Sequence, residues 1–427
     1  MLYKGTLNVY FPCELGNSQE IKHIRRMWND IFRCHRNISR GKRSPNTNQM
    51  DILAFRSQKE SLLKAYQAFW AQRFGVSLPC HDAGCYATPE LANEYRHPRE
   101  DNLFVKSTSL QLSSFDVKYG PLTDKNENVT IQGTLLFSVN IDNRVATAIL
   151  VLNFENLNVD DVIILKHTFY KRCHVSITED GKEKRVNTFQ EYVTSKLGPI
   201  YPYIKHDIDC RARYMLMEVI EPIVTFQNIN QRKRIIYGLL TCDEGWRHAR
   251  NFKKENGQNH SNRNSFQLYY NNKNALIVTS QQEHSQYIRE KRDMWRRNII
   301  PAPNHIEPPM FPERCDIAGV DKQLFAKYLK TVELDYLITS ALTSEISSKI
   351  RMSIYNLFAL IRRAIRLWKV LNDLDLNIYH IDKSMHQSFG VSKNMSDIRQ
   401  EYNEIVNLVT NYFILLVALL TLWATVK

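Results

Sequence analysis

Residues 405–426 have the sequence IVNLVTNYFILLVALLTLWATV, which contains no charged residue and lies between Glu404 and Lys427. As an α-helix, these 22 residues would extend about 33 Å, enough to cross a bilayer core of about 30 Å. Trp423 near the far end suits an interfacial anchor. The stretch therefore predicts one C-terminal transmembrane helix, with the lipid bilayer as its partner.

The predicted membrane helix is not uniformly apolar. Six positions at intervals of 4, 3, 4, 3 and 4 residues share one helix face, and five of them are small or polar: Asn407, Asn411, Ile414, Ala418, Thr421 and Thr425. In lipid, amides and small side chains favour helix–helix contact or a wet lumen. We therefore predict that Asn407, Asn411, Ala418, Thr421 and Thr425 line a pore or a helix interface in a homo-oligomer. A plain tail anchor and a buried coiled-coil helix of a soluble protein stay open as alternatives.

The composition outside this helix is that of an ordinary globular protein. The chain has 427 residues, 43% hydrophobic and 24% charged, which indicates two or three domains. The N-terminus has no apolar signal core, and the eight cysteines lack the spacing of a disulfide framework. We expect the body of the chain in the cytoplasm, below the inner (plasma) membrane. The net charge of +13 favours anionic partners.

Residues 1–125 are predicted to form a mixed α/β region. Leu7, Val9 and Phe11 alternate as on a half-buried strand, and an apolar face indicates a helix over residues 58–74. Between these elements, residues 36–48 are basic and polar, which is typical of a loop.

Residues 126–250 are predicted to form an α/β core domain. Strands are expected at 130–140 and 144–154 around an Asp142-Asn143 turn, followed by a helix over 159–170 that Asn158 caps. A strand is expected at 173–178, and the apolar segments 211–226 and 234–240 favour further strands.

The rest of the chain changes composition twice. Residues 251–315 are rich in Asn and Pro and are predicted to be loop and linker, with one short strand at 275–279. Residues 316–395 are predicted to be a helical stalk, and residues 396–427 the transmembrane helix. The predicted fold class is α+β, a mixed α/β body followed by an α-helical C-terminal region.

Two basic stretches and one loop supply the candidate ligand-binding residues. Arg232-Lys233-Arg234 is a tight basic run, and residues 287–297 interleave basic and aromatic residues. Trp246 and Arg247 follow the predicted strand at 235–240, where they would suit stacking on a base and contact with a phosphate. The candidates are Arg232, Arg234, Trp246, Arg247, Arg292 and Arg296. A solvated surface, and a structural turn with a packing tryptophan, are the simpler interpretations.

Signals for catalysis and metal binding are weak. Cys242 to His248 bring together a thiol, two carboxylates and an imidazole, but adjacent carboxylates on a strand point to opposite faces. Cys80-His81 with Cys85 lacks the second ligand pair of a zinc site. Glycine-rich phosphate loops and metalloprotease motifs are absent from the sequence. We therefore predict no catalytic residue, no metal and no cofactor; a membrane-tethered hydrolase would depend on residues 242–248.

The order of parts resembles one known family. A basic α/β domain, then helices, then a C-terminal membrane helix resembles the CorA-type magnesium channels, and within them the CorA-like membrane effectors found beside type III CRISPR systems. The similarity covers the strand–strand–helix run at residues 130–170 and the helical stretch Thr331–Leu337. It implies a homo-oligomer, pentameric in that superfamily, and a nucleotide second messenger as ligand. The Gly-Met-Asn signature is absent and only one membrane helix is predicted, so magnesium selectivity is not implied.

Two functional hypotheses follow. The leading one is an oligomeric membrane effector in antiviral defence, whose cytoplasmic domain senses an anionic ligand and alters membrane permeability. The alternative is a non-enzymatic, tail-anchored scaffold that binds nucleic acid or protein at the membrane.

Overall fold

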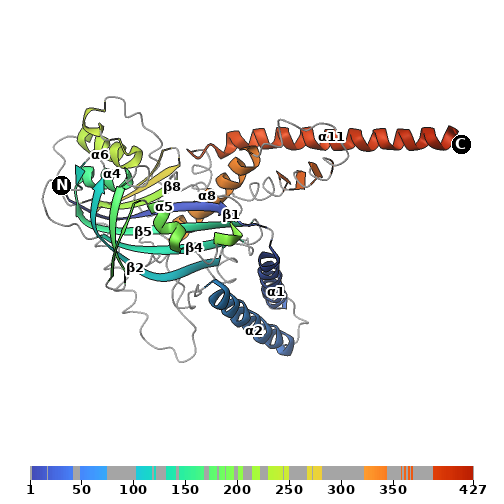
Figure 1. Cartoon of the computed structure of the whole chain (residues 1–427), viewed down its shortest axis with the longest axis horizontal. Coiled ribbons are helices and arrows are strands. Elements are labelled where there is room, and N and C mark those ends of the chain that lie inside the picture. The colour runs from blue at the N-terminus through green and yellow to red at the C-terminus, as the bar shows by residue number, and fades with distance from the viewer. Residues whose placement is uncertain are drawn as a thin grey trace. The chain divides into compact units, whose positions relative to one another are not determined.

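A ten-stranded sheet forms the centre of the N-terminal part of the computed structural model (Figure 1). The chain divides into two units, Met1–Ala326 and Lys327–Lys427. The structure describes residues 2–16, 18–41, 49–74, 102–117, 120–121, 131–140, 144–167, 173–179, 182–187, 189–196, 201–204, 214–221, 229–243, 245–249, 267–271, 273–280, 322–343, 357, 360–361, 364–365, 367–368 and 388–426.

The strand order of the sheet is β7-β6-β2-β4-β5-β1-β8-β10-β9, and β3 pairs with β2. Neighbouring strands are antiparallel, except that β8 and β10 are parallel. The strands are β1 (Tyr3–Glu14), β2 (Asn102–Val117), β3 (Gly120–Pro121), β4 (Ile131–Asn140), β5 (Val145–Leu157), β6 (Cys173–Glu179), β7 (Lys182–Val186), β8 (Tyr214–Glu221), β9 (Gln267–Asn271) and β10 (Asn274–Ser280).

Most strands lie where the sequence predicts them. The expected strands at 130–140, 144–154, 173–178 and 275–279 correspond to β4, β5, β6 and β10. The predicted segment 211–226 contains β8, and the alternating residues 7–11 lie in β1. The Asp142-Asn143 turn lies outside the described residues; Arg144, directly after it, has a positive φ of 56°. The sheet takes strands from each of the predicted regions 1–125, 126–250 and 251–315.

One face of the sheet is apolar and carries helices. Its inward side chains include Leu7, Leu152 and Met217, which belong to one buried cluster with residues of the helices. The helices α4 (Val159–His167) and α6 (Ile229–Thr241) lie together beside the sheet in Figure 1, and α5 (Phe189–Lys196) supplies further buried side chains. Two short 3-10 helices, η2 (Tyr201–Tyr203) and η3 (Trp246–His248), complete this part.

The opposite face of the sheet is more polar, although it is also buried. Thr6 donates a hydrogen bond to the side chain of Asn153 at 2.9 Å, and Thr279 donates to Glu218 at 3.1 Å. Asn8 donates to the carbonyl of Leu216 at 3.3 Å. These bonds join neighbouring strands, so the buried polar groups reinforce the pairing of β1 with β5 and β8 and the pairing of β10 with β8.

A reciprocal cap fixes the start of α4. The backbone N–H of Asp161 donates to Asn158 Oδ1 at 3.0 Å, and the backbone N–H of Asn158 donates to Asp161 Oδ2 at 3.3 Å. This capping box satisfies two N–H groups at the helix terminus. The predicted N-cap is therefore confirmed, and the predicted helix is confirmed as far as His167.

The helical hairpin α1 (Gln19–Gly41) and α2 (Gln49–Phe74) corrects one prediction. Trp28 of α1 packs against Tyr66 of α2, with 5.6 Å between ring centroids. The predicted loop at 36–48 is wrong for residues 36–41, which continue α1; residues 42–48 lie outside the described residues. The apolar stripe that anchors α1 has helical spacing and reaches Cys34, so the polar residues beyond it extend an established helix: Ile21, Ile24, Trp28, Ile31 and Cys34.

The segment 234–240 is a second correction, because it lies in the helix α6 and not in a strand. Ile235, Ile236, Leu239 and Leu240 are all buried. Their spacing places them on one side of a helix, with Arg232 and Lys233 preceding them. A short apolar run does not distinguish a strand from a buried helix, and here the helix covers the sheet.

The C-terminal unit contains most of α8 (Lys322–Thr343) and all of α11 (Val391–Val426). Gly390, with a φ of +70°, lies immediately before α11, which begins at Val391 and therefore five residues before the predicted start at residue 396. Within α11, residues Arg399–Thr425 are long and apolar enough to cross a membrane. The α+β class is therefore shown, with a long apolar helix at the C-terminus; residues 344–356 and most of 358–387 lie outside the described residues.

Candidate functional site

The N-terminal half of α6 lies beside the carboxyl ends of the parallel strands β8 and β10. The chain runs from β8 through α6 to β10, and Glu221 at the end of β8 pairs in register with Ser280 at the end of β10. In α/β folds, ligands bind outside the carboxyl ends of parallel strands, where the following helix begins. The sheet topology therefore brings Arg232, in the first turns of α6, to a place where binding residues commonly occur.

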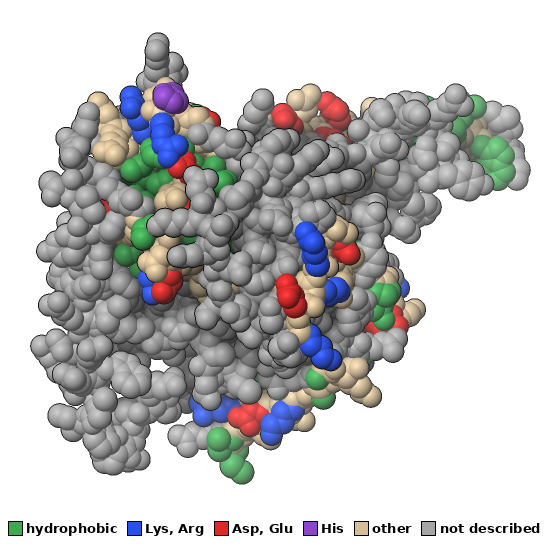
Figure 2. Space-filling model, turned by 60° about the vertical axis from the view of Figure 1, so that its left-hand side comes forward, with side chains coloured by type: hydrophobic (Ala, Val, Ile, Leu, Met, Phe, Trp, Pro, Cys, Tyr) green, Lys and Arg blue, Asp and Glu red, His purple; other side chains and the backbone are tan. Residues whose placement is uncertain are grey.

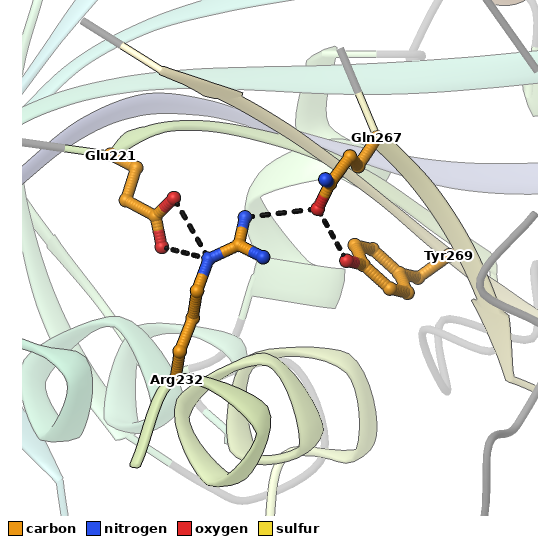
Figure 3. Close-up of polar contacts among 4 residues, drawn as sticks. All are labelled: Glu221, Arg232, Gln267 and Tyr269. Atoms are coloured by element: carbon orange, nitrogen blue, oxygen red, sulfur yellow. Dashed lines mark hydrogen bonds and ion pairs between the residues drawn. The ribbon is translucent and has the colours of Figure 1, made fainter. Parts of the chain in front are cut away.

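Arg232 is the centre of a polar network there (Figure 3). Its Nε donates to both carboxylate oxygens of Glu221, at 2.9 and 3.1 Å, and its Nη2 donates to Gln267 Oε1 at 2.9 Å. The hydroxyl of Tyr269 donates to the same Gln267 oxygen at 2.6 Å. The side chains of Arg232 and Glu221 are 27% and 11% exposed. The guanidinium of this α6 residue is therefore held by partners from β8 and β9 and is only partly open to solvent.

The charges of this network change the pKa of its members. Burial raises the pKa of the Tyr3 phenol, and the negative charge of Glu221 raises it further against the opposing effect of Arg232. Burial also raises the pKa of Tyr269, while Arg232 opposes that shift. Burial alone would lower the pKa of Arg232, but its hydrogen bond and charge interaction with Glu221 raise it. The network therefore holds one cation and one anion beside two neutral phenols.

Arg234, the second predicted residue of this basic run, differs from Arg232. Its Nε is buried and has no hydrogen-bond partner among the described residues. On the face of the molecule in Figure 2, described Lys and Arg side chains lie close to described Asp and Glu side chains. Although the chain has a net charge of +13, the described part of that face carries no continuous basic patch.

Trp246 and Arg247 lie beyond the other end of α6, where both contact Asp160 in the first turn of α4. The indole Nε1 of Trp246 donates to Asp160 Oδ1 at 2.9 Å, and Arg247 Nη2 forms an ion pair with Asp160 Oδ2. The Arg247 guanidinium also lies 5.0 Å from the centre of the Trp246 ring. This cluster joins the turn after α6 to the start of α4.

Gly238 allows the indole to pack on α6. A Cβ at this position would lie 2.7 Å from Cβ and Cγ of Trp246, closer than non-bonded atoms approach. Trp246 is 8% exposed, so its ring serves as a packing group in this structure. Arg247 is 58% exposed, and of the two side chains it is the one that an external ligand can reach.

The two ends of α6 do not form one site. Arg232 and the turn at Cys242 are separated by ten helical positions, or about 15 Å. Arg292 and Arg296 lie outside the described residues, so the structure does not test them.

The sequence did not identify the partners of Arg232 and Arg247, which are Glu221, Gln267, Tyr269 and Asp160. A signal existed for Glu221, because it is one of two carboxylates in the mostly apolar strand YMLMEVIE, and a buried carboxylate requires a partner.

The reactive cluster at residues 242–248 forms a turn after a helix, and not after a strand as predicted. Cys242 is buried, adopts a positive φ of 59° and donates its backbone N–H to Gly238 O at 2.8 Å. The carboxylate of Asp243 accepts the backbone N–H of Gly245 at 2.8 Å, as in an Asx turn. These contacts close the helix end; Glu244 lies outside the described residues.

The apolar part of α11 is exposed on all sides. From Phe413 to Trp423, the large apolar side chains are 47–65% exposed: Phe413, Ile414, Leu415, Leu416, Val417, Leu419, Leu420, Leu422 and Trp423. Eleven consecutive residues cover about three helical turns and therefore every face. The predicted stripe residues Asn407, Asn411, Ala418, Thr421 and Thr425 are exposed as well.

Neither a search for metal-binding groups among the described residues nor comparison with known proteins points to a further site. Among the described residues, no group of three or more His, Cys, Asp or Glu side chains is arranged to hold a metal ion. Cys80, His81 and Cys85 lie outside the described residues. Comparison of the chain with protein-family models, curated proteins and solved structures found no match.

Proposed function

We propose that this protein is a homo-oligomeric effector of the inner membrane, anchored by α11. In this proposal, the α/β body lies in the cytoplasm and senses an anionic ligand, a nucleotide second messenger in antiviral defence, and ligand binding alters membrane permeability. The observation that carries it is the exposure of nine large apolar side chains between Phe413 and Trp423.

The size of this exposure favours lipid as the solvent of α11. Removing one such side chain from water is worth about 1.5–3 kcal/mol. A soluble monomer rarely exposes a contiguous apolar surface of this kind. Because the residues cover every face of the helix, a single protein partner on one side would leave the others in water. A bilayer covers all of them together.

The ligand-sensing half of the proposal depends on Arg247, in the turn that follows α6, because Arg232 of α6 is already held by Glu221 and Gln267. Arg247 is 58% exposed beside an Asp160 side chain that is 36% exposed. Exposed ion pairs contribute about 0–1 kcal/mol, so a phosphate can replace the carboxylate at small cost. The excess of 57 basic over 44 acidic residues favours association with such an anion.

Membrane insertion is tested by extraction of the full chain from cell membranes at alkaline pH. We expect the protein to stay in the pellet and to require detergent for release. The double variant Leu416→Arg, Leu419→Arg should move most of the protein out of the pellet, because each charge near the bilayer centre costs about 2.5–3.5 kcal/mol. The matched variant Gln400→Arg, on the polar part of α11, should stay in the pellet. Release of the unaltered protein at alkaline pH would refute the membrane anchor.

Permeability is tested in liposomes that contain the purified full chain. The double variant Asn407→Leu, Asn411→Leu should abolish ion flux and leave ligand binding unchanged, since the exposed amides lie on α11 and the arginines in the other unit. Unchanged flux in this variant would refute the pore.

The tail-anchored scaffold stays as a second candidate because of one observation. The hydroxyl of Thr421 donates to Val417 O at 2.8 Å, and that of Thr425 donates to Thr421 O at 3.1 Å. Threonines bonded within their own helix do not require a wet lumen. The scaffold predicts no ion flux and salt-sensitive binding of nucleic acid by the body.

A further inference from the structure

The N-terminal half of α11 has two unlike faces. Ile405 is 4% exposed, and Leu408, Val409 and Tyr412 near it are half-buried. Asn407 and Asn411 are exposed. At 100° per residue, Ile405 and Asn407 are about 160° apart around the helix axis. The chain therefore covers the apolar side of this half of α11 and leaves the amide side uncovered.

The uncovered amide side begins before the apolar stretch. Asn403, Gln400 and Ser396 precede Asn407 at intervals of 4, 3 and 4 residues, and all three are exposed. This spacing keeps them on the face of Asn407 and Asn411. One polar face thus continues along α11 from its charged N-terminal part into the apolar stretch.

The polar groups along α11 differ in their need for a partner. The hydroxyls of Thr421 and Thr425 already donate to carbonyls of their own helix. The amides of Asn407 and Asn411 form no hydrogen bond with any described residue. A carboxamide carries two N–H donors and one carbonyl acceptor, and hydrocarbon satisfies none of them. The requirement for an external partner is therefore concentrated in the first half of the stripe.

We infer that the amide face, formed by Asn403, Asn407 and Asn411, is the contact surface between parallel copies of this chain. The inference rests on the proposed function, because it requires α11 to be in a bilayer. Asn411 lies about 9 Å beyond Ile405 along the helix, below the reach of surface water. Every copy enters the membrane in the same direction, so a second copy presents its own Asn411 at the same depth. Since an amide both donates and accepts, two identical amides satisfy each other.

The test measures the mass of the detergent-solubilised full chain by light scattering over a dilution series, with crosslinking in native membranes. We expect an oligomer that Asn407→Leu, Asn411→Leu weakens by about 3- to 30-fold in association constant per amide. The conservative variant Asn407→Gln, Asn411→Gln keeps both amides and should retain the oligomer. The matched control Thr421→Val, Thr425→Val, on the same stripe, should also retain it.

Two outcomes would overturn this inference: an oligomer that survives loss of both amides, or one that the threonine variant weakens equally. Extraction at alkaline pH separates these results from failure of the proposed function. A chain that stays in the membrane pellet as an oligomer without both amides contradicts the amide contact alone, and a monomeric chain in the pellet contradicts the oligomer as well but leaves the anchor intact. A chain released from the pellet contradicts the anchor itself. The leucine variant should stay in the pellet, because replacing an amide by an apolar side chain favours insertion.

Discussion

The two ends of α6 each hold an arginine on a carboxylate, and they differ in how far solvent reaches the pair. At the first end, Arg232 and Glu221 are 27% and 11% exposed, and Gln267 bonds the guanidinium as well. At the second, Arg247 and Asp160 are 58% and 36% exposed. Burial strengthens an ion pair once formed and makes its disruption costly, whereas solvent weakens it. Arg232 is therefore fixed in place, and Arg247 is available to exchange its partner.

The largest effect is expected from Glu221→Ala, because it leaves a partly buried guanidinium without its anion. We expect a loss of about 2–3 kcal/mol in the free energy of unfolding, below the full value for a deeply buried charge since water still reaches Arg232. Urea unfolding of the detergent-solubilised chain, followed by circular dichroism, measures it.

Glu183→Ala is the matched control for this variant. Glu183 is an exposed residue of β7, and its removal should change the free energy by less than about 0.5 kcal/mol. If Glu221→Ala were as mild as the control, the contrast between a fixed and an exchangeable arginine would be lost.

Gly238→Ala is expected to have the next largest effect, at the C-terminal end of α6, where Trp246 packs. Alanine favours a helix over glycine by about 1 kcal/mol, but its Cβ would lie 2.7 Å from Trp246. We expect overpacking to dominate and to lower stability by about 1–3 kcal/mol. Thermal unfolding followed by tryptophan fluorescence should show an earlier transition. At Gly245 the nearest atom to an added Cβ is the movable Asp243 Oδ1, at 3.2 Å, so Gly245→Ala should be milder; equal effects would contradict the packing role of Trp246.

Sequence patterns predicted the sheet better than the site because they report on different interactions. Alternation in β1 and β-branched runs in β4 and β5 follow from burial, which each residue displays by its own type. The helix α6 was missed because Ile235 to Leu240 are apolar in either conformation. The partners Glu221 and Asp160 were missed because they lie 11 and 87 residues from their arginines. Such pairing depends on strand order and helix placement, which local spacing does not contain.

The long apolar stretch of α11 was predicted from the sequence alone, because its length and composition can both be read there. The sequence did not predict the difference between the threonines and the asparagines of its polar stripe. Thr421 and Asn411 are both polar in sequence, and only the backbone geometry shows that the hydroxyl of Thr421 already donates to Val417 O.

The third prediction concerns the stability of the protein at alkaline pH, which depends on the Tyr3 phenol near Glu221 and Arg232. The folded-state pKa of Tyr3 is raised, so above about pH 10 the unfolded chain releases this proton while the folded chain retains it. The unfolded state then binds fewer protons, and the free energy of unfolding falls as pH rises, by at most about 1.4 kcal/mol per pH unit for one group. Urea unfolding at pH 9, 10 and 11 should show a shallower decline for Tyr3→Phe than for the unaltered chain. Parallel declines would contradict a buried neutral phenol beside Glu221.

The smallest change in stability is expected from Asp160→Asn, which tests the exchangeable end directly. Asparagine keeps an oxygen for the Trp246 indole and removes the charge that pairs with Arg247. Because the pair is exposed, the loss should be below about 1 kcal/mol and should shrink at high salt. Binding should change in the opposite direction: without a competing carboxylate, Arg247 should bind ATP, used as an anionic probe, about 3- to 5-fold more tightly. Calorimetric titration measures this, and Arg247→Ala should abolish the gain. A gain that persists in the Asp160→Asn, Arg247→Ala double variant would show that the probe binds elsewhere, and Arg247 would then be a structural partner of Asp160 alone.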